Sequence, residues 1–342
     1  MTNFEKEILE QPSVLEKVIN DQNLDQVAQE LTNKDIQIIL TLARGSSDNA
    51  VTFFSYLAGQ YLGIPVASLP PSLFSVYSSK LKIANALVIG VSQSGESSDV
   101  VASLQSIEDS GATTLAISNK ANSSLAKVAD YSINQQAGQE LAVAASKTFS
   151  SQMMVLATLV AKWSQNQELT KALEKVPTAM TSFMANSQIK DAALRLTHAE
   201  SAYILGRGLS NAPALELALK LKETNYLHAQ AYSSAEFQHG PIASVSATDP
   251  IILLANNDKT IESNQIVAQK LHDLGADITI ISSCSSLFKY ANTLIELPAD
   301  LHTVSESFLQ ILASQLLALN LTISKGLDPD APRNLSKVTK TL

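Results

Sequence analysis

The sequence has few features of an extracellular or membrane-bound protein. One cysteine in 342 residues excludes an intramolecular disulfide framework. The N-terminal residues 1–7 include acidic side chains where a signal peptide would have basic residues and an apolar core, so we expect a cytoplasmic protein. The longest apolar stretch, 308–323, is interrupted by polar residues such as Gln310 and Gln315, which predicts a buried helix and no membrane partner.

Positive charge is also scarce. Charged residues make up 16% of the chain, the net charge is −8, and no cluster of lysines and arginines occurs. Because binding to a nucleic-acid backbone needs a cationic face, we expect no nucleic-acid partner. The histidines lack metal-ligand spacing backed by carboxylates, so we expect no metal and no other cofactor. A hydrophobic content of 45% instead predicts a globular chain, long enough for two domains.

Hydroxyl-rich turns follow two predicted strands in the first half. The apolar run 86–91 precedes Ser92-Gln93-Ser94-Gly95-Glu96-Ser97, and the run 36–43 precedes Arg44-Gly45-Ser46-Ser47. A helical pattern follows each turn, and exposed amides at a helix N-terminus bind anions. Since open parallel sheets bind ligands at the carboxyl ends of their strands, the pair of turns predicts a site for a phosphate group. Ordinary helix capping is the alternative explanation for either turn alone.

The chain contains an internal repeat. The strand and turn 38–47 have a counterpart in 202–210, and the runs 86–91 and 112–118 have counterparts in 250–255 and 276–282. Alternating strands and helices predict two similar α/β domains, each a doubly wound parallel sheet in a three-layer αβα arrangement. The predicted organisation is an N-terminal segment of two short helices at 1–34, a phosphate-binding domain at 35–178, a second domain at 179–328 and a C-terminal tail at 329–342.

The second half lacks the serine-rich turn. Asn256-Asn-Asp-Lys259 stands in its place, and Asp258 would repel an anion, so only the first domain is expected to bind phosphate. Two other site types also fail. The segment 206–211 has Asn211 where a dinucleotide fingerprint needs a third small residue, and 90–94 ends in Ser94 where a hydrolase nucleophile elbow has glycine.

Candidate reactive residues lie in the second half and the tail. Lys220 and Glu223 are three residues apart on a predicted helix over 215–226, so they share a face; an ordinary exposed ion pair is the alternative. His239 lies in a loop closed by Gly-Pro, which is typical of a surface histidine. Lys337 lies near the C-terminus, where a solvated lysine is the simplest reading. Cys284 follows an apolar run and is interpreted as a small buried hydrophobic residue rather than a nucleophile.

Several of these residues belong to motifs that occur in the same order in a known family. The motifs are Ser92-Gln-Ser-Gly-Glu-Ser97, Gly138-Gln-Glu-Leu-Ala-Val-Ala-Ala-Ser-Lys147, Leu219-Lys-Leu-Lys-Glu223, Glu236-Phe-Gln-His-Gly-Pro241 and Pro332-Arg-Asn-Leu335 followed by Lys337. They closely resemble the isomerase half of glucosamine-6-phosphate synthases, and the chain is identified as a tandem sugar isomerase (SIS) domain protein. The resemblance begins near residue 5 and covers nearly the whole chain.

The resemblance implies roles for the candidate residues. Glu223 matches the glutamate that moves a proton between the first two sugar carbons. A carboxylate is suited to this task if partial burial raises its pKa. Lys220 matches a lysine that assists, and Lys337 matches one that forms a Schiff base with an open-chain ketose. His239 matches a histidine that opens the sugar ring from the neighbouring subunit, which implies a homodimer. Contacts to phosphate and sugar are expected from Ser46, Ser47, Ser92, Gln93, Ser94, Ser97, Val143 and Ala145.

The departures from the synthase pattern shape the expected reaction. Ala145 stands where the synthases have a serine that contacts sugar, although the hydroxyl of Ser146 could compensate, and Ser97 replaces a threonine. The chain begins where the isomerase half begins, so we expect no glutamine hydrolysis. The expected reaction converts glucosamine 6-phosphate to fructose 6-phosphate and ammonia. The alternatives are a fructosamine-6-phosphate deglycase, a ketose–aldose phosphosugar isomerase, and a regulator that senses a sugar phosphate without turnover.

Overall fold

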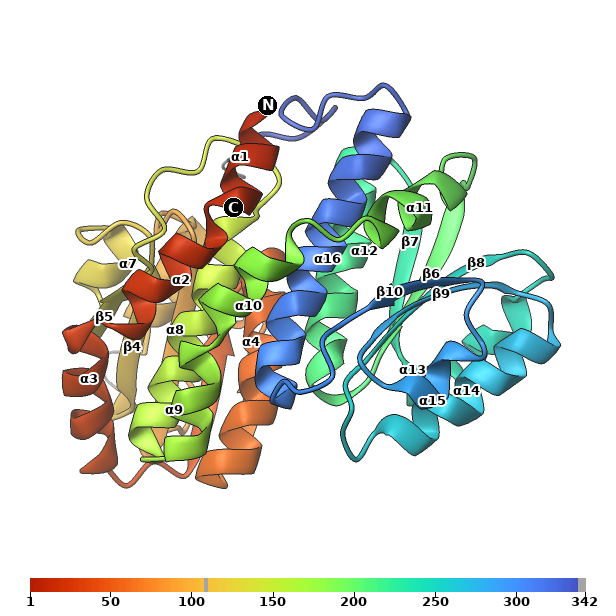
Figure 1. Cartoon of the computed structure of the whole chain (residues 1–342). Helices are drawn as coiled ribbons and strands as arrows, with labels where there is room; N and C mark the ends of the chain where they lie inside the picture. The colour runs from red at the N-terminus through yellow and green to blue at the C-terminus, as the bar shows by residue number, and fades with distance from the viewer. Residues whose placement is uncertain (108–109, 338–342) are drawn as a thin grey trace. The chain divides into compact units, whose positions relative to one another are not determined.

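The computed structural model describes residues 1–107 and 110–337 (Figure 1). Contacts between Cα atoms divide the chain into two compact units, each built on one sheet. Of the described residues, the first-sheet unit consists of Ser13–Glu140, Lys147–Glu174 and 336–337. The second-sheet unit consists of Met1–Pro12, Leu141–Ser146 and Lys175–Leu335. The chain therefore passes between the units several times, and the last five residues of the predicted tail, 338–342, lie outside the described residues.

The first sheet has five parallel strands in the order β2-β1-β3-β4-β5. These are β1 Ile38–Leu42, β2 Val66–Ser68, β3 Ala86–Ser92, β4 Thr113–Ser118 and β5 Tyr131–Asn134. The chain leaves β1 toward one edge to form β2 and then returns to place β3 on the other side of β1. The topological switch point of this sheet therefore lies between β1 and β3, and ligands of open α/β sheets bind at such a point.

Helices cover both faces of the first sheet. Leu40, Leu42 and Val88 share a buried cluster with α6 residues such as Leu104, whereas Ile39 and the other alternate residues of the strands are equally buried on the opposite face. The helices of this unit are α2 Gln11–Ile19, α3 Gln22–Thr32, α4 Ser46–Leu57 with a π-helical turn at Ala58–Leu62, α5 Ser72–Ser75, α6 Ser98–Gln105, α7 Ser124–Lys127, α8 Lys147–Trp163 and α9 Gln167–Glu174. The three-layer arrangement is confirmed for this unit.

The second sheet repeats the same topology, with strand order β10-β9-β8-β6-β7. Its strands are β6 Ser201–Gly206, β7 His228–Ser233, β8 Pro250–Ala255, β9 Asp277–Ser282 and β10 Thr293–Glu296. Its helices are α1 Asn3–Leu9, α10 Val176–Phe183, α11 Gln188–Arg195, α12 Asn211–Asn225, α13 Ser234–Phe237, α14 Ile261–Asp273, α15 Ser285–Phe288 and α16 Thr303–Ser324, with 3₁₀ turns at Gly208–Ser210 and Pro241–Ser244. Figure 1 shows α13, α14 and α15 on one side of this sheet and α12 and α16 on the other. The predicted repeat of strands and the α/β fold class are therefore confirmed.

The N-terminal segment differs from its prediction, because it forms three helices rather than two. Thr2 caps α1 by accepting a hydrogen bond from the backbone N–H of Glu5. Pro12 lies in the first turn of α2, where a missing N–H costs no helical hydrogen bond. Asp21 caps α3 by accepting from the N–H of Asn23. Each of the three helices therefore has its own local start signal, but the prediction of two helices did not separate them.

The longest apolar stretch forms a core helix, α16. By length and composition α16 could cross a membrane, but 83% of its most apolar window is buried inside the protein. Two of its polar side chains form buried hydrogen bonds: Gln310 donates to Asn256 at 2.8 Å, and Gln315 accepts from Gln11 at 2.7 Å. The predictions of a buried helix here and of a buried Cys284 are confirmed.

Candidate active site

The two serine-bearing turns of the first half lie at the same edge of the first sheet. Strands β1 and β3 are hydrogen-bonded neighbours, with Leu42 opposite Gly90, so their carboxyl ends are adjacent. Ser46 and Ser47 open α4 directly after β1, and Ser97 precedes α6 after β3. The turns therefore flank the switch point, and both helix N-termini face this edge of the sheet, where an anion is stabilised.

Hydrogen bonds fix the shape of the second turn. The Oγ of Ser92 accepts from the N–H of Gly95 at 3.1 Å and lies 3.1 Å from the Oγ of Ser97. The Oγ of Ser94 accepts from the N–H of Glu96 at 3.2 Å, so its own proton can be donated to a ligand. Gly95 has φ +66°, and a Cβ there would lie 2.3 Å from the Cβ of Ser123. Only glycine allows this turn.

The corresponding edge of the second sheet is occupied by the protein itself. The backbone N–H groups of Asn257 and Ser283 both donate to the carboxylate of Glu306 from α16, at 3.0 and 3.1 Å. Asp258 accepts from the N–H and the hydroxyl of Thr260. Burial raises the pKa of Glu306, although the hydrogen bonds from Asn257 and Ser283 oppose the rise. Amides that could bind an external anion are thus already bonded to an internal carboxylate, which agrees with a phosphate site in the first domain only.

A buried ionic cluster lies on one face of α12. Lys220 is fully buried, its Nζ donates to Glu223, and it lies 3.4 Å from Oε1 of Glu216. Burial lowers the pKa of Lys220, but the two carboxylates outweigh this effect and the net shift is upward, so the ammonium form is held. The exposed-pair interpretation of Lys220 and Glu223 is wrong. With 22% of its side chain exposed, Glu223 is the member of the cluster that a ligand can reach.

Sequence reasoning missed Glu216. The signal was present, because residues 216, 220 and 223 follow the i, i+4, i+7 spacing that places side chains on one helical face. A fully buried carboxylate needs a cation, and Lys220 supplies it. Glu216 therefore fixes the position of Lys220, which in turn holds Glu223.

A pocket of about 380 Å³ opens beside Glu223 at the end of α12. Tyr226 ends the helix in the left-handed conformation with φ +57°. The Arg333 guanidinium lies 4.0 Å from the centre of the Tyr226 ring, and the Arg333 N–H donates to the Tyr226 hydroxyl at 3.1 Å. Remaining lining residues are Lys222, Leu227, His228, Asn334 and Leu335. Tyr226 therefore holds the C-terminal tail in place through Arg333.

Lys337 is bonded to a buried glutamate rather than freely solvated. Its Nζ lies 2.6 Å from Oε2 of Glu140, whose side chain is fully buried and also accepts from the N–H and hydroxyl of Thr148. Burial raises the pKa of Glu140, but the Lys337 ammonium and the Thr148 hydrogen bonds outweigh it, so the net shift is downward. Sequence reasoning missed this role of Glu140 because its partner is distant in the chain.

We expect Lys337→Met to make the protein more sensitive to acid. Because the pKa of Glu140 lies below its ordinary value of 4.5, Glu140 stabilises the folded state above that pH, and this contribution is lost as the pH falls through the folded-state pKa. Without the ammonium, burial dominates and the pKa rises, so acid unfolding should begin at higher pH. Circular dichroism against pH measures this, with the exposed Lys80→Met as the control. Identical acid transitions in both variants would contradict the role of the pair.

His239 and the residues at 143–146 lie outside the ionic cluster on α12. His239 lies exposed in the turn after α13, and its N–H donates to the carbonyl of Glu236. Val143 and Ala145 are half-buried in Leu141–Ser146, a segment held through Leu141 and Ala142, whose N–H groups donate to Glu7 of α1. The adjacent Ser146 is fully buried, so its hydroxyl does not replace an exposed one at 145.

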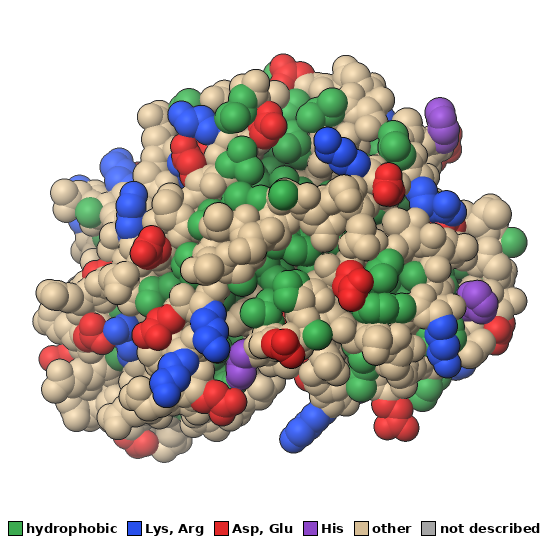
Figure 2. Space-filling view, in the orientation of Figure 1, with side chains coloured by type: hydrophobic (Ala, Val, Ile, Leu, Met, Phe, Trp, Pro, Cys, Tyr) green, Lys and Arg blue, Asp and Glu red, His purple; other side chains and the backbone are tan. Residues whose placement is uncertain are grey.

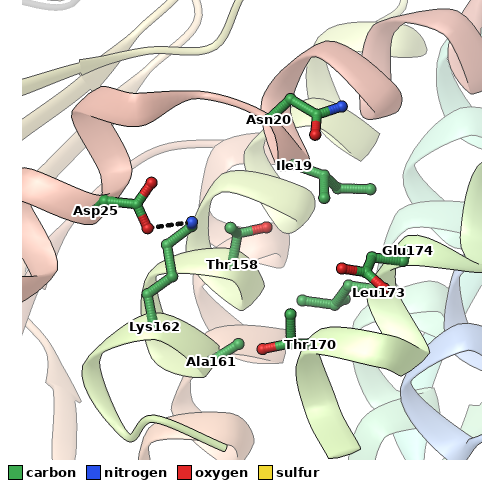
Figure 3. Close-up of a pocket in the computed structure, with 9 residues that line it drawn as sticks. All are labelled: Ile19, Asn20, Asp25, Thr158, Ala161, Lys162, Thr170, Leu173 and Glu174. Atoms are coloured by element: carbon green, nitrogen blue, oxygen red, sulfur yellow. Dashed lines mark hydrogen bonds and ion pairs between the residues drawn. The ribbon is translucent and has the colours of Figure 1, made fainter. Parts of the chain in front are cut away.

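The remaining surface features lie apart from these residues. Figure 3 shows a pocket of about 270 Å³ in the first-sheet unit, where Lys162 pairs with Asp25, and no candidate residue is among its described lining. Lysine and arginine side chains are interspersed with aspartate and glutamate on the face in Figure 2. Within 1–107 and 110–337, no group of three or more His, Cys, Asp or Glu side chains is placed to hold a metal.

Comparisons with known proteins agree with this architecture. The SIS domain model matches residues 30–162 and 195–325, once on each sheet. The chain belongs to the SIS domain family. It is 31% identical to the glutamine–fructose-6-phosphate aminotransferase of Aquifex aeolicus over 97% of its own length, and it spans 56% of that relative. Both domains of the SIS tandem therefore lie within a little over half of the curated relative.

Solved structures show the same SIS tandem. A candidate phosphosugar isomerase from Silicibacter pomeroyi superposes with a TM-score of 0.88 at 33% identity, covering 96% of this chain and 100% of that one. The glucosamine-6-phosphate deaminase of Thermotoga maritima superposes with a TM-score of 0.79, covering 99% and 100%. At 22% identity, this second likeness concerns the fold alone.

Proposed function

We propose that this chain is a phosphosugar isomerase that converts glucosamine 6-phosphate and water to fructose 6-phosphate and ammonia. The observation that carries the proposal is the cluster of Glu216, Lys220 and Glu223 on α12, in which a partly exposed carboxylate is held by a buried ammonium. A proton carrier needs a fixed position and access to the substrate, and Glu223 has both. The serine turns at the first switch point supply donors for a phosphate.

In the proposed mechanism, Glu223 takes the proton from C2 of the open-chain amino sugar and delivers it to C1. Loss of the C2 proton with protonation of the C1 oxygen gives an enolamine, and delivery of the proton to C1 with loss of one from nitrogen gives a C2 imine. Water hydrolyses this imine to the ketone with release of ammonia. Lys220 fixes the position of the Glu223 carboxylate for this transfer, because its buried Nζ donates a hydrogen bond to it. The phosphate contributes binding energy through Ser46, Ser47, Ser92, Gln93, Ser94 and Ser97, and Val143 and Ala145 are the proposed neighbours of the sugar.

His239 and Lys337 have separate proposed roles. An exposed histidine on a turn is accessible to another copy of the chain, and we assign His239 to ring opening in the partner's site of a homodimer. Lys337 is proposed to bind the open-chain ketose through its amine, which requires release of the ammonium from Glu140 and loss of a proton.

A substrate panel tests the proposal. Purified protein without added metal is expected to release ammonia and fructose 6-phosphate from glucosamine 6-phosphate. The other substrates are a fructosamine 6-phosphate conjugate of an amino acid and fructose 6-phosphate alone. Cleavage of the conjugate without ammonia release would favour a deglycase, whereas aldose formation from fructose 6-phosphate alone would favour a ketose–aldose isomerase. Binding without any turnover would favour a sensor.

Loss of the turn hydroxyls should weaken phosphosugar binding. We expect the double variant Ser47→Ala, Ser94→Ala to raise KM, because each hydrogen bond to a charged group contributes about 1.5–3 kcal/mol. The matched control is Ser210→Ala, at the position of the second sheet that corresponds to Ser47. Its hydroxyl is buried without a hydrogen-bond partner among the described residues, so its removal should leave KM near the wild-type value. Steady-state kinetics measures KM for each variant. An unchanged KM in the double variant argues against the phosphate site.

The proposed dimer has a complementation test. We expect inactive Glu223→Gln subunits mixed with inactive His239→Ala subunits to recover part of the activity, because one site in each mixed dimer receives both wild-type groups. Mass spectrometry of differently tagged subunits confirms exchange. If exchange occurs and activity stays absent, His239 does not act across subunits.

A further inference from the structure

An ion pair connects the two turns at the first switch point. The Nε of Arg44, in the turn after β1, donates to Oδ2 of Asp99, in the first turn of α6, at 3.0 Å. Asp99 is almost completely buried, with 2% of its side chain exposed, whereas 54% of the Arg44 side chain is exposed. The Asp99 carboxylate is therefore enclosed by the protein, whereas the Arg44 side chain is accessible to a ligand.

Acidic side chains at this edge of the sheet oppose the attraction of the helix N-termini for a phosphate. Asp99 lies in the first turn of α6, and Asp48 lies in the first turn of α4. Burial raises the pKa of Asp48, and the Ser68 hydrogen bond and the charge of Arg44 oppose that rise. The third carboxylate, Glu96, pairs with Lys120 at 2.9 Å. Serine hydroxyls add no positive charge, so a phosphate dianion here needs a cation.

Arg44 is placed to supply that cation. A guanidinium has donors on both sides of its planar fork, and the Nε side is bonded to Asp99. More than half of the Arg44 side chain is exposed, so its two Nη groups remain for a ligand. Two parallel N–H donors match the oxygens of a phosphate, and this geometry distinguishes arginine from lysine.

We propose that Arg44 binds the substrate phosphate directly and that Asp99 is its positioning residue. This inference rests on the proposed phosphosugar function and adds the charged group that selects for a phosphate ester. Asp99 holds the guanidinium between the two turns, and Arg44 neutralises the buried carboxylate that would otherwise repel the ligand. The second domain differs in this respect, since Glu306 rather than an external anion bonds to the amides at its switch point.

Kinetics of three variants test the role of Arg44. We expect Arg44→Met to raise KM for the phosphosugar by roughly 10- to 100-fold, with a much smaller change in kcat. Arg44→Lys keeps the charge but loses the fork, so its KM should be intermediate. The matched control is Arg195→Met, which breaks an Arg–Asp pair with Asp277 at the amino end of β9 and should leave KM near the wild-type value.

A double-variant cycle tests whether Asp99 acts through Arg44. Asp99→Ala alone should raise KM, because the guanidinium loses its anchor. The combination of Arg44→Met and Asp99→Ala should raise KM no further than Arg44→Met alone, since the coupled residues share one effect. If the increase in KM of the double variant equals the product of the two single increases, Asp99 acts independently of Arg44. That result would overturn its positioning role.

Calorimetric titration with inorganic phosphate gives a readout independent of turnover. Wild-type protein should bind phosphate, and Arg44→Met should bind it at least tenfold more weakly while its thermal unfolding stays cooperative. If Arg44→Met fails to fold, the comparison passes to Arg44→Lys, which retains the ion pair. Equal affinities in wild type and a folded Arg44 variant would overturn the inference while the proposed function stands. Absence of phosphate and phosphosugar binding in the wild type would overturn both.

Discussion

Replacing Glu223 with glutamine is expected to lower kcat for glucosamine 6-phosphate by roughly 10²–10⁴-fold, the usual effect of losing a general acid or base. Glutamine has the same size and can still accept a hydrogen bond from Lys220, so the cluster keeps its shape while the proton carrier is lost. KM should change much less than kcat, because the proposed phosphate contacts come from other residues.

Steady-state kinetics with the purified variant measures this effect. The control is Glu262→Gln, an exposed glutamate in the first turn of α14 that keeps wild-type kinetics in this account. A Glu223→Gln protein with near wild-type kcat would remove Glu223 from the chemistry and leave the α12 cluster with a purely structural role.

The second large effect concerns stability. We expect Lys220→Met to lower the free energy of unfolding by about 3–5 kcal/mol, because Glu216 would remain buried without its cation. The partly exposed Glu223 contributes less to this loss, since water screens its charge. Urea unfolding followed by fluorescence measures the change.

Two further variants separate charge from packing. Lys222→Met alters an exposed lysine of the same helix and should leave the free energy of unfolding nearly unchanged. Adding Glu216→Gln to Lys220→Met removes the uncompensated buried charge and should restore part of the lost stability. If Lys220→Met is as stable as the control, the cluster is more solvated than its burial indicates.

Local patterns predicted most of the fold and part of the candidate site. The apolar runs and the turns at 44–47 and 92–97 predicted strand ends and helix starts, because those features depend on near neighbours in sequence. Their placement at one sheet edge also followed, since parallel strands align their carboxyl ends. The structure adds that β1 and β3 are direct neighbours at the switch point.

Pairs that are distant in the chain could not be predicted. Arg44 and Asp99, and Glu140 and Lys337, meet only through tertiary packing. No short-range pattern marks such a partner, because any surface lysine or arginine has the same local sequence signal. Glu216 is different, since its helical spacing to Lys220 was visible and only its complete burial was unknown.

The most direct test of the central claim follows the hydrogen at C2. Glucosamine 6-phosphate deuterated at C2 is incubated with the purified protein, and the product is examined by NMR. We expect fructose 6-phosphate and ammonia, with deuterium transferred to C1 or exchanged with solvent, at a rate that falls about 10²–10⁴-fold in Glu223→Gln. Two results would contradict proton transfer by Glu223. One is that the wild-type protein removes no deuterium from C2, and the other is that Glu223→Gln removes it at the wild-type rate.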